Sequence, residues 1–81
     1  MPFVEVKVFK DELSSDQTRA LIEKITDAVI AVTSEKLKEV TWVIVSEIPS
    51  GHWGVGGAVL GLDDVRKLVT APVHYLDTDM R

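Results

Sequence analysis

Residues 40–48 read VTWVIVSEI, and the centre of this stretch, residues 42–45, is continuously apolar and rich in β-branched side chains. A short run of this kind predicts a β-strand that is covered on both faces. Upstream, residues 15–33 carry apolar side chains at helical spacing. Ser14 and Gln17 have the pattern of a capping box at the start of this segment. The sequence thus predicts a helix that leads, through a short polar connector, into this strand.

Residues 3–9, FVEVKVF, alternate between two kinds of side chain. Valines point to one face, and the other face carries Phe3, Glu5, Lys7 and Phe9, which predicts a strand with one face on a core. Strand, helix and strand together form a βαβ unit, whose two strands run parallel. One helix covers only one face of a two-stranded sheet, so we expect another copy of the chain to cover the other face.

A glycine-rich segment follows the second strand, where residues 50–61 read SGHWGVGGAVLG. Glycine permits positive φ angles, so this segment predicts a tight hairpin or a close approach of the backbone to another part of the chain. A short tail helix is expected to begin at Asp63 or Asp64 and to end before Pro72. We therefore predict a single α/β domain over residues 1–81, with a core at about 2–57 and a C-terminal extension at about 58–81.

The composition narrows the possible functions. The chain has 81 residues and no cysteine, so its core is small and disulfides cannot support it, which again favours an oligomer. The net charge of −4 and the scattered basic residues argue against a nucleic-acid partner. Glu5 and Lys7 interrupt the N-terminal apolar stretch, so this stretch does not have the pattern of a signal peptide. No apolar run is long enough to span a membrane. We therefore expect a cytoplasmic protein without a membrane partner. His52 and His74 lack the spacing of metal ligands, so no metal site is expected.

Pro2 directly precedes the first predicted strand. Proline lacks an amide hydrogen and is tolerated at the first residue of a strand, so a structural role alone explains its presence. A chemical role is also open, because removal of Met1 leaves Pro2 with a free secondary amine on a rigid strand. The pKa of an α-amino group is about 8 and desolvation lowers it, so this amine is suited to act as a base near neutral pH. While Met1 remains attached, the nitrogen is an amide and cannot accept a proton.

Pro2, the βαβ pattern and the segment GHWGVGG (residues 51–57) together resemble the 4-oxalocrotonate tautomerase family over about residues 2–57. The resemblance implies a cofactor-independent isomerase that interconverts the enol and keto forms of a small-molecule 2-oxo acid, with Pro2 as the catalytic general base. It also implies a homo-oligomer, for which a hexamer is favoured while a dimer or trimer stays open. Trp53 matches the aromatic residue that lines the family's pocket, and Trp42 falls at the position of a substrate-binding arginine, so both are expected to bind substrate.

A second family arginine belongs just after the first strand, where this chain reads Asp11-Glu12-Leu13, so both arginines are absent. Because arginine binds carboxylates as a bidentate donor, their absence favours a monoacid over a diacid as substrate. Stabilisation of a developing enolate then needs another source, and the candidates are Lys7, Lys10, Arg66, backbone N–H groups or a neighbouring subunit.

Two alternatives stay open on the same scaffold. A hydratase or dehalogenase of small unsaturated acids would use protonated Pro2 as a general acid, with Asp11 or Glu12 activating water. An inactive oligomeric binding or scaffold protein would keep the fold without either arginine.

Overall fold

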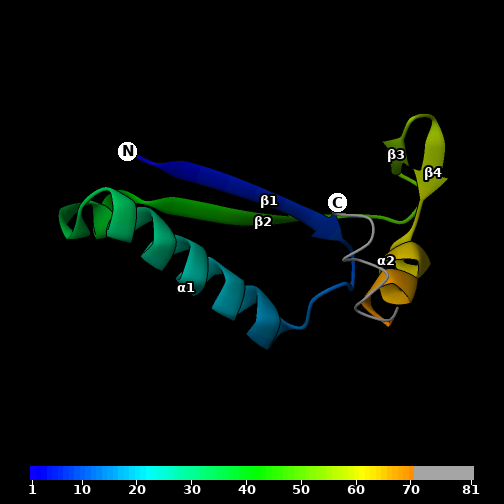
Figure 1. Ribbon diagram of the computed structural model, residues 1–81, viewed down its shortest axis with the longest axis horizontal. Helices are drawn as coiled ribbons and strands as arrows, with labels where there is room; N and C mark the ends of the chain where they lie inside the picture. The colour runs from blue at the N-terminus through cyan, green and yellow to red at the C-terminus, as the bar shows by residue number, and fades with distance from the viewer. Residues whose placement is uncertain (71–81) are drawn as a thin grey trace, which may run out of the picture.

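The computed structural model describes residues 1–70, which form an α/β fold (Figure 1). Its elements, in chain order, are strand β1 (Phe3–Phe9), helix α1 (Ser15–Val32), the 3₁₀-helix η1 (Glu35–Val40), strand β2 (Trp42–Ile48), strands β3 (Trp53–Val55) and β4 (Ala58–Leu60), and helix α2 (Leu62–Val69). The predicted βαβ unit, glycine-rich hairpin and tail helix are all present. Residues 71–81, with His74 and the end of the predicted C-terminal extension, lie outside the described residues.

Strands β1 and β2 pair in parallel along their whole length, from Phe3 opposite Trp42 to Phe9 opposite Ile48. Helix α1 lies along one face of this two-stranded sheet (Figure 1). Val8 of β1 and Ile30 of α1 are both buried, as expected for a core between the sheet and the helix. The parallel pairing predicted from the strand–helix–strand order is therefore confirmed.

The second face of the sheet, which we call the open face, carries the odd-numbered side chains of β1 and the even-numbered ones of β2. Phe3, Trp42 and Ile44 on this face remain 60%, 55% and 40% exposed. The expectation that the second strand is covered on both faces is thus not met within residues 1–70 of a single chain. A contiguous apolar surface of this kind is typical of a contact between proteins, so its covering by another copy stays a prediction.

Local hydrogen bonds set where α1 begins and where β2 starts. Ser14 Oγ accepts from the Gln17 amide at 3.1 Å, and Gln17 Oε1 accepts from the Ser14 amide at 2.9 Å, which confirms the predicted capping box. The polar connector folds as η1, and Ser34 Oγ caps it by accepting from the Lys36 amide at 3.2 Å. Because η1 runs on to Val40, β2 begins at Trp42, two residues after the start of the predicted strand.

Strands β3 and β4 form an antiparallel hairpin that turns at two glycines. Gly56 and Gly57 have φ angles of +57° and +85°, the positive values that a two-residue type I′ turn requires at both central positions. The hairpin leads directly into α2, which begins at Leu62, one residue before the predicted start. None of the helices within residues 1–70 has the length and apolar character needed to cross a membrane.

The first turn of helix α2 is hydrogen-bonded to the segment that directly follows β2. The Leu62 amide donates to Ser50 Oγ at 2.9 Å, and the Gly61 amide donates to Asp64 Oδ2 at 2.8 Å. Gly61 approaches Ser50 so closely that a Cβ at this position would lie 3.2 Å from the serine Cβ. This contact directs α2 back toward the turn that follows β1 (Figure 1).

Candidate active site

Pro2 lies at the start of the sheet, directly before β1. Its carbonyl oxygen accepts a hydrogen bond from the Trp42 amide at 3.0 Å, which ties it to the first residue of β2. Since proline has no amide hydrogen, its place ahead of the first ladder residue costs the sheet no hydrogen bond. Pro2 itself is half-buried, whereas Met1 is 84% exposed.

Trp42 lies beside Pro2, so the structure brings these two predicted site residues together. Its indole belongs to the open face, next to Phe3, the residue opposite it in the parallel ladder. The two aromatic side chains give this end of the sheet an apolar surface.

Trp53 lies at the opposite end of the sheet. Its ring packs against Phe9, with ring centroids 4.9 Å apart and planes inclined by 37°. Phe9 is the last residue of β1, and a seven-residue strand is about 20 Å long. Figure 1 shows the N-terminus at one end of the sheet and the β3–β4 hairpin at the other. A single chain therefore does not bring Trp53 to Pro2.

The acidic turn after β1 also lies at the Trp53 end. Asp11 has a φ of +67°, a left-handed conformation that aspartate tolerates better than most residues, and its amide donates to Glu47 Oε2 at 3.1 Å. Glu12 Oε1 accepts from the Phe9 amide at 3.0 Å. The carboxylates proposed to activate water in a hydratase or dehalogenase are thus at the far end of β1 from Pro2 of the same chain.

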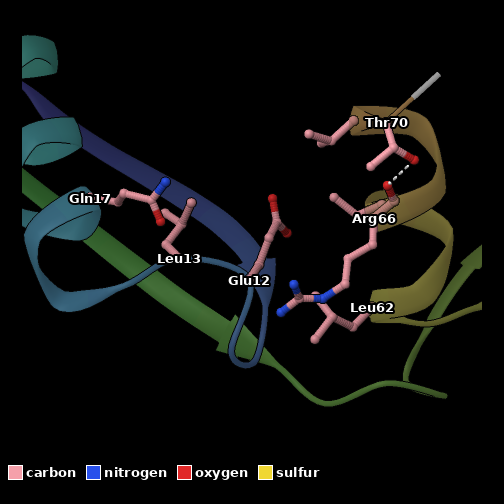
Figure 2. Close-up of a pocket in the computed structure, with 8 residues that line it drawn as sticks. Glu12, Leu13, Gln17, Leu62, Arg66 and Thr70 are labelled. Carbon is pink, nitrogen blue, oxygen red and sulfur yellow. Dashed lines mark hydrogen bonds between the residues drawn. The ribbon is translucent and has the colours of Figure 1, made fainter. Parts of the chain in front are cut away.

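Arg66 of α2 reaches this turn, and its Nη2 donates to the Asp11 carbonyl oxygen at 3.3 Å. Helix α2 and the turn line an open cavity of about 380 Å³, and Figure 2 shows the Arg66 side chain extending from α2 toward Glu12. The sequence names Arg66 among several possible cations but gives no reason to place it here. Its position depends on the way α2 folds back, which no local pattern encodes.

A small polar cluster crosses the middle of the open face. Ser46 Oγ donates to Glu5 Oε2 at 2.8 Å, and Lys7 Nζ lies 3.4 Å from the same oxygen. The hydroxyl hydrogen bond, followed by the charge of Lys7, lowers the pKa of the Glu5 carboxyl below its ordinary value. Lys7 is therefore engaged with Glu5 at mid-sheet, between the two ends that carry the candidate site residues.

The fold is that of a small α/β subunit built on one βαβ unit. The protein-family model described as tautomerase enzyme matches residues 2–63. A probable tautomerase of Dickeya dadantii is 35% identical over 57 residues, which cover 70% of this chain and 84% of the relative. A probable tautomerase of Halalkalibacterium halodurans is 42% identical over 57 residues, which cover 70% of this chain and 90% of the relative.

Solved structures agree with this assignment. A structure from work on the 4-oxalocrotonate tautomerase isozymes of Methylibium petroleiphilum superposes with a TM-score of 0.63 at 31% identity, covering 72% of this chain and 90% of the other. The DmpI structure from Helicobacter pylori gives a TM-score of 0.66 at 26% identity, covering 82% and 97%. The chain belongs to the tautomerase family, which confirms the resemblance seen in the sequence and places it among tautomerase-type isomerases.

Proposed function

We propose that this protein interconverts the enol and keto forms of a 2-oxo acid, with the Pro2 amine as general base once Met1 has been removed. The observation that carries the proposal is the place of Pro2, which is half-buried directly before β1 and whose carbonyl oxygen accepts a hydrogen bond from the Trp42 amide. Membership of the tautomerase family supports the reaction type.

The proposed reaction needs one base and no cofactor. The neutral amine of Pro2 takes the proton from the enol oxygen, and the electron pair moves through the enolate to carbon. The protonated amine then returns a proton to that carbon, so the substrate is isomerised and the base is regenerated. The ring restricts the direction of the amine, which limits the entropy lost in positioning it.

The complete site in this proposal is shared between two copies of the chain. Pro2 and Trp42 come from one copy, and Trp53 comes from another, because about 20 Å of strand separates them within a chain. The exposed apolar side chains of the open face supply a surface on which such copies associate. We propose a homo-oligomer, with a hexamer favoured over a dimer or a trimer.

Turnover of phenylenolpyruvate by protein whose intact mass shows removal of Met1 tests this proposal. Pro2→Ala should lose most of the rate above the uncatalysed background, since general acid–base catalysis contributes roughly 10²- to 10⁴-fold. Pro49→Ala is the matched control, because it also removes a proline ring next to a strand but leaves the secondary amine of Pro2 intact. Equal rates for Pro2→Ala and the wild-type protein would show that the secondary amine of Pro2 is not required.

A further inference from the structure

The cavity between α2 and the turn after β1 combines an apolar wall with one cation. Its volume is about 380 Å³, enough for a small organic molecule. The apolar part of the wall is formed by Leu13, Leu62, Val65 and Val69. Arg66 is the only lysine or arginine that lines it, within the part of the chain that the structure describes.

Among the described residues, the contact made by Arg66 leaves most of its N–H donors without a protein partner. Within residues 1–70, its guanidinium donates one hydrogen bond, from Nη2 to the Asp11 carbonyl oxygen at 3.3 Å. A guanidinium carries several N–H donors in a fixed plane that matches a carboxylate. The left-handed turn at Asp11 and the attachment of α2 to Ser50 together fix both ends of this arrangement.

We propose that this cavity binds the carboxylate of an apolar monocarboxylic acid, with Arg66 as the residue that holds the carboxylate. The identification of that acid as the 2-oxo acid substrate rests on the proposed function. The apolar wall receives the body of the ligand, and the guanidinium receives its single negative charge. Figure 2 shows the Arg66 side chain extending into the space between α2 and the turn.

The charges around Arg66 explain why a monoanion fits better than a dianion. Glu12 lines the same cavity, and its carboxylate is held there by the hydrogen bond from the Phe9 amide at 3.0 Å. A second carboxylate on the ligand would meet this negative charge without a second cation to offset it. The cavity therefore selects by charge as well as by shape.

This cavity also lies at the Trp53 end of the sheet, where Phe9 packs on the indole and Asp11 and Glu12 follow Phe9 in the chain. Arg66 and Trp53 lie at the same end of the sheet, so an assembly that places this end of one copy beside Pro2 of another also brings α2 to the same region. In that assembly, Arg66 supplies the positive charge that stabilises the enolate as it forms.

Binding of 3-phenylpropanoate, an unreactive monoacid, tests the proposal without relying on turnover. The probe is titrated by methyl NMR, with the methyl signals of Leu62, Val65 and Val69 as local reporters. Arg66→Gln should weaken binding by roughly tenfold, the low end for a lost charge-assisted hydrogen bond because Arg66 is solvent-exposed. Lys67→Gln, which removes an equal charge from the next position of the same helix, should leave binding within about twofold.

Two further probes separate charge from shape. The neutral 3-phenylpropanamide and the dianion benzylmalonate should both bind more weakly than 3-phenylpropanoate to the wild-type protein. Equal binding of the acid and the amide, or an equal loss in Arg66→Gln and Lys67→Gln, would overturn the proposal. Tighter binding of benzylmalonate would overturn its charge selectivity.

Turnover distinguishes failure of this inference from failure of the proposed function. Arg66→Gln should raise KM for phenylenolpyruvate more than it lowers kcat, because it removes a contact made in both the ground state and the transition state. If Pro2→Ala abolishes turnover while Arg66→Gln changes neither KM nor probe binding, Arg66 has no role and the proposed function stands. If 3-phenylpropanoate binding depends on Arg66 but Pro2→Ala is fully active, the cavity stands and the proposed base is wrong.

Discussion

The separation of Pro2 from Trp53 leads to a test in which two impaired variants restore each other. Pro2→Ala replaces the proposed secondary amine with a more flexible primary amine, and Trp53→Ala removes the proposed aromatic wall. Each proposed site draws Pro2 from one chain and Trp53 from another, because the seven-residue strand β1 holds them about 20 Å apart within a chain. Mixed oligomers of the two variants therefore contain some sites in which both residues are wild type.

The size of the effect follows from random assembly of equal amounts of the two variants. Half of the sites receive a wild-type Pro2, and half of these receive a wild-type Trp53, so about a quarter of the wild-type activity should return. A site built within one chain gives a different result, because every chain then carries one defect. In that case the activity of the mixture equals the mean of the two parent variants.

The assay mixes the unfolded variants, refolds them together and follows ketonisation of phenylenolpyruvate. Sedimentation of each refolded sample shows whether it regains the size of the wild-type assembly. The control mixes Pro2→Ala with the double variant Pro2→Ala/Trp53→Ala, which contains no wild-type Pro2 and should regain nothing. Activity no higher than the parental mean, in samples of wild-type size, would refute a shared site.

Three further predictions concern the fold and the open face. Ile44→Lys places a charge on the open face, at a position that is 40% exposed in a single chain. It should dissociate the proposed oligomer, seen by sedimentation, while the far-ultraviolet circular dichroism of the subunit is retained. Unchanged sedimentation would show that the open face is not the contact between copies. Gly57→Ala forces alanine to a φ of +85° and should lower the free energy of unfolding in urea by about 1 kcal/mol, whereas in Gly54→Ala the new Cβ meets only an ordinary contact at 3.6 Å and the loss should be smaller. The pKa of the Glu5 carboxyl is lower in the folded protein than its ordinary value of 4.5, so the contacts of the carboxylate stabilise the fold above pH 4.5 and are lost as pH falls through the folded-state pKa. The difference in unfolding free energy between the wild-type protein and Glu5→Gln should therefore shrink as pH falls below 4.5. A constant difference down to pH about 3 would contradict this.

The elements that the sequence predicts well are those whose signal is local. Alternation over residues 3–9 places Val8 toward the helix, and the Ser14–Gln17 pair marks the start of α1, since both depend only on neighbouring residues. The start of β2 is predicted less well. Residues 40 and 41 look like strand by composition, yet the cap at Ser34 begins a 3₁₀-helix that continues to Val40.

The candidate site shows the same division between local and distant information. Pro2 and Trp42 meet because parallel pairing follows from the βαβ order, so their proximity is predictable in principle from the register. The place of Trp53 is not, because it depends on the length of β1 and on the direction in which the hairpin leaves the sheet. Arg66 depends on one close approach, Gly61 against Ser50, and nothing in the residues around Arg66 indicates it.

The open face and the divided site have one geometric solution in common. A two-fold axis perpendicular to the strands reverses their direction, so it places the N-terminal end of one β1 beside the C-terminal end of another. In the proposed assembly, such an arrangement would place the Pro2 and Trp42 end of one copy beside the Trp53 end of its partner, and would do so twice. Burial of Phe3 and Ile44 would then drive the association, and the Glu5–Ser46 contact at mid-sheet would give it a polar element that can fix the register. A chain of 81 residues, with three buried core side chains among those described, would thereby gain stability and a complete site from the same proposed contact.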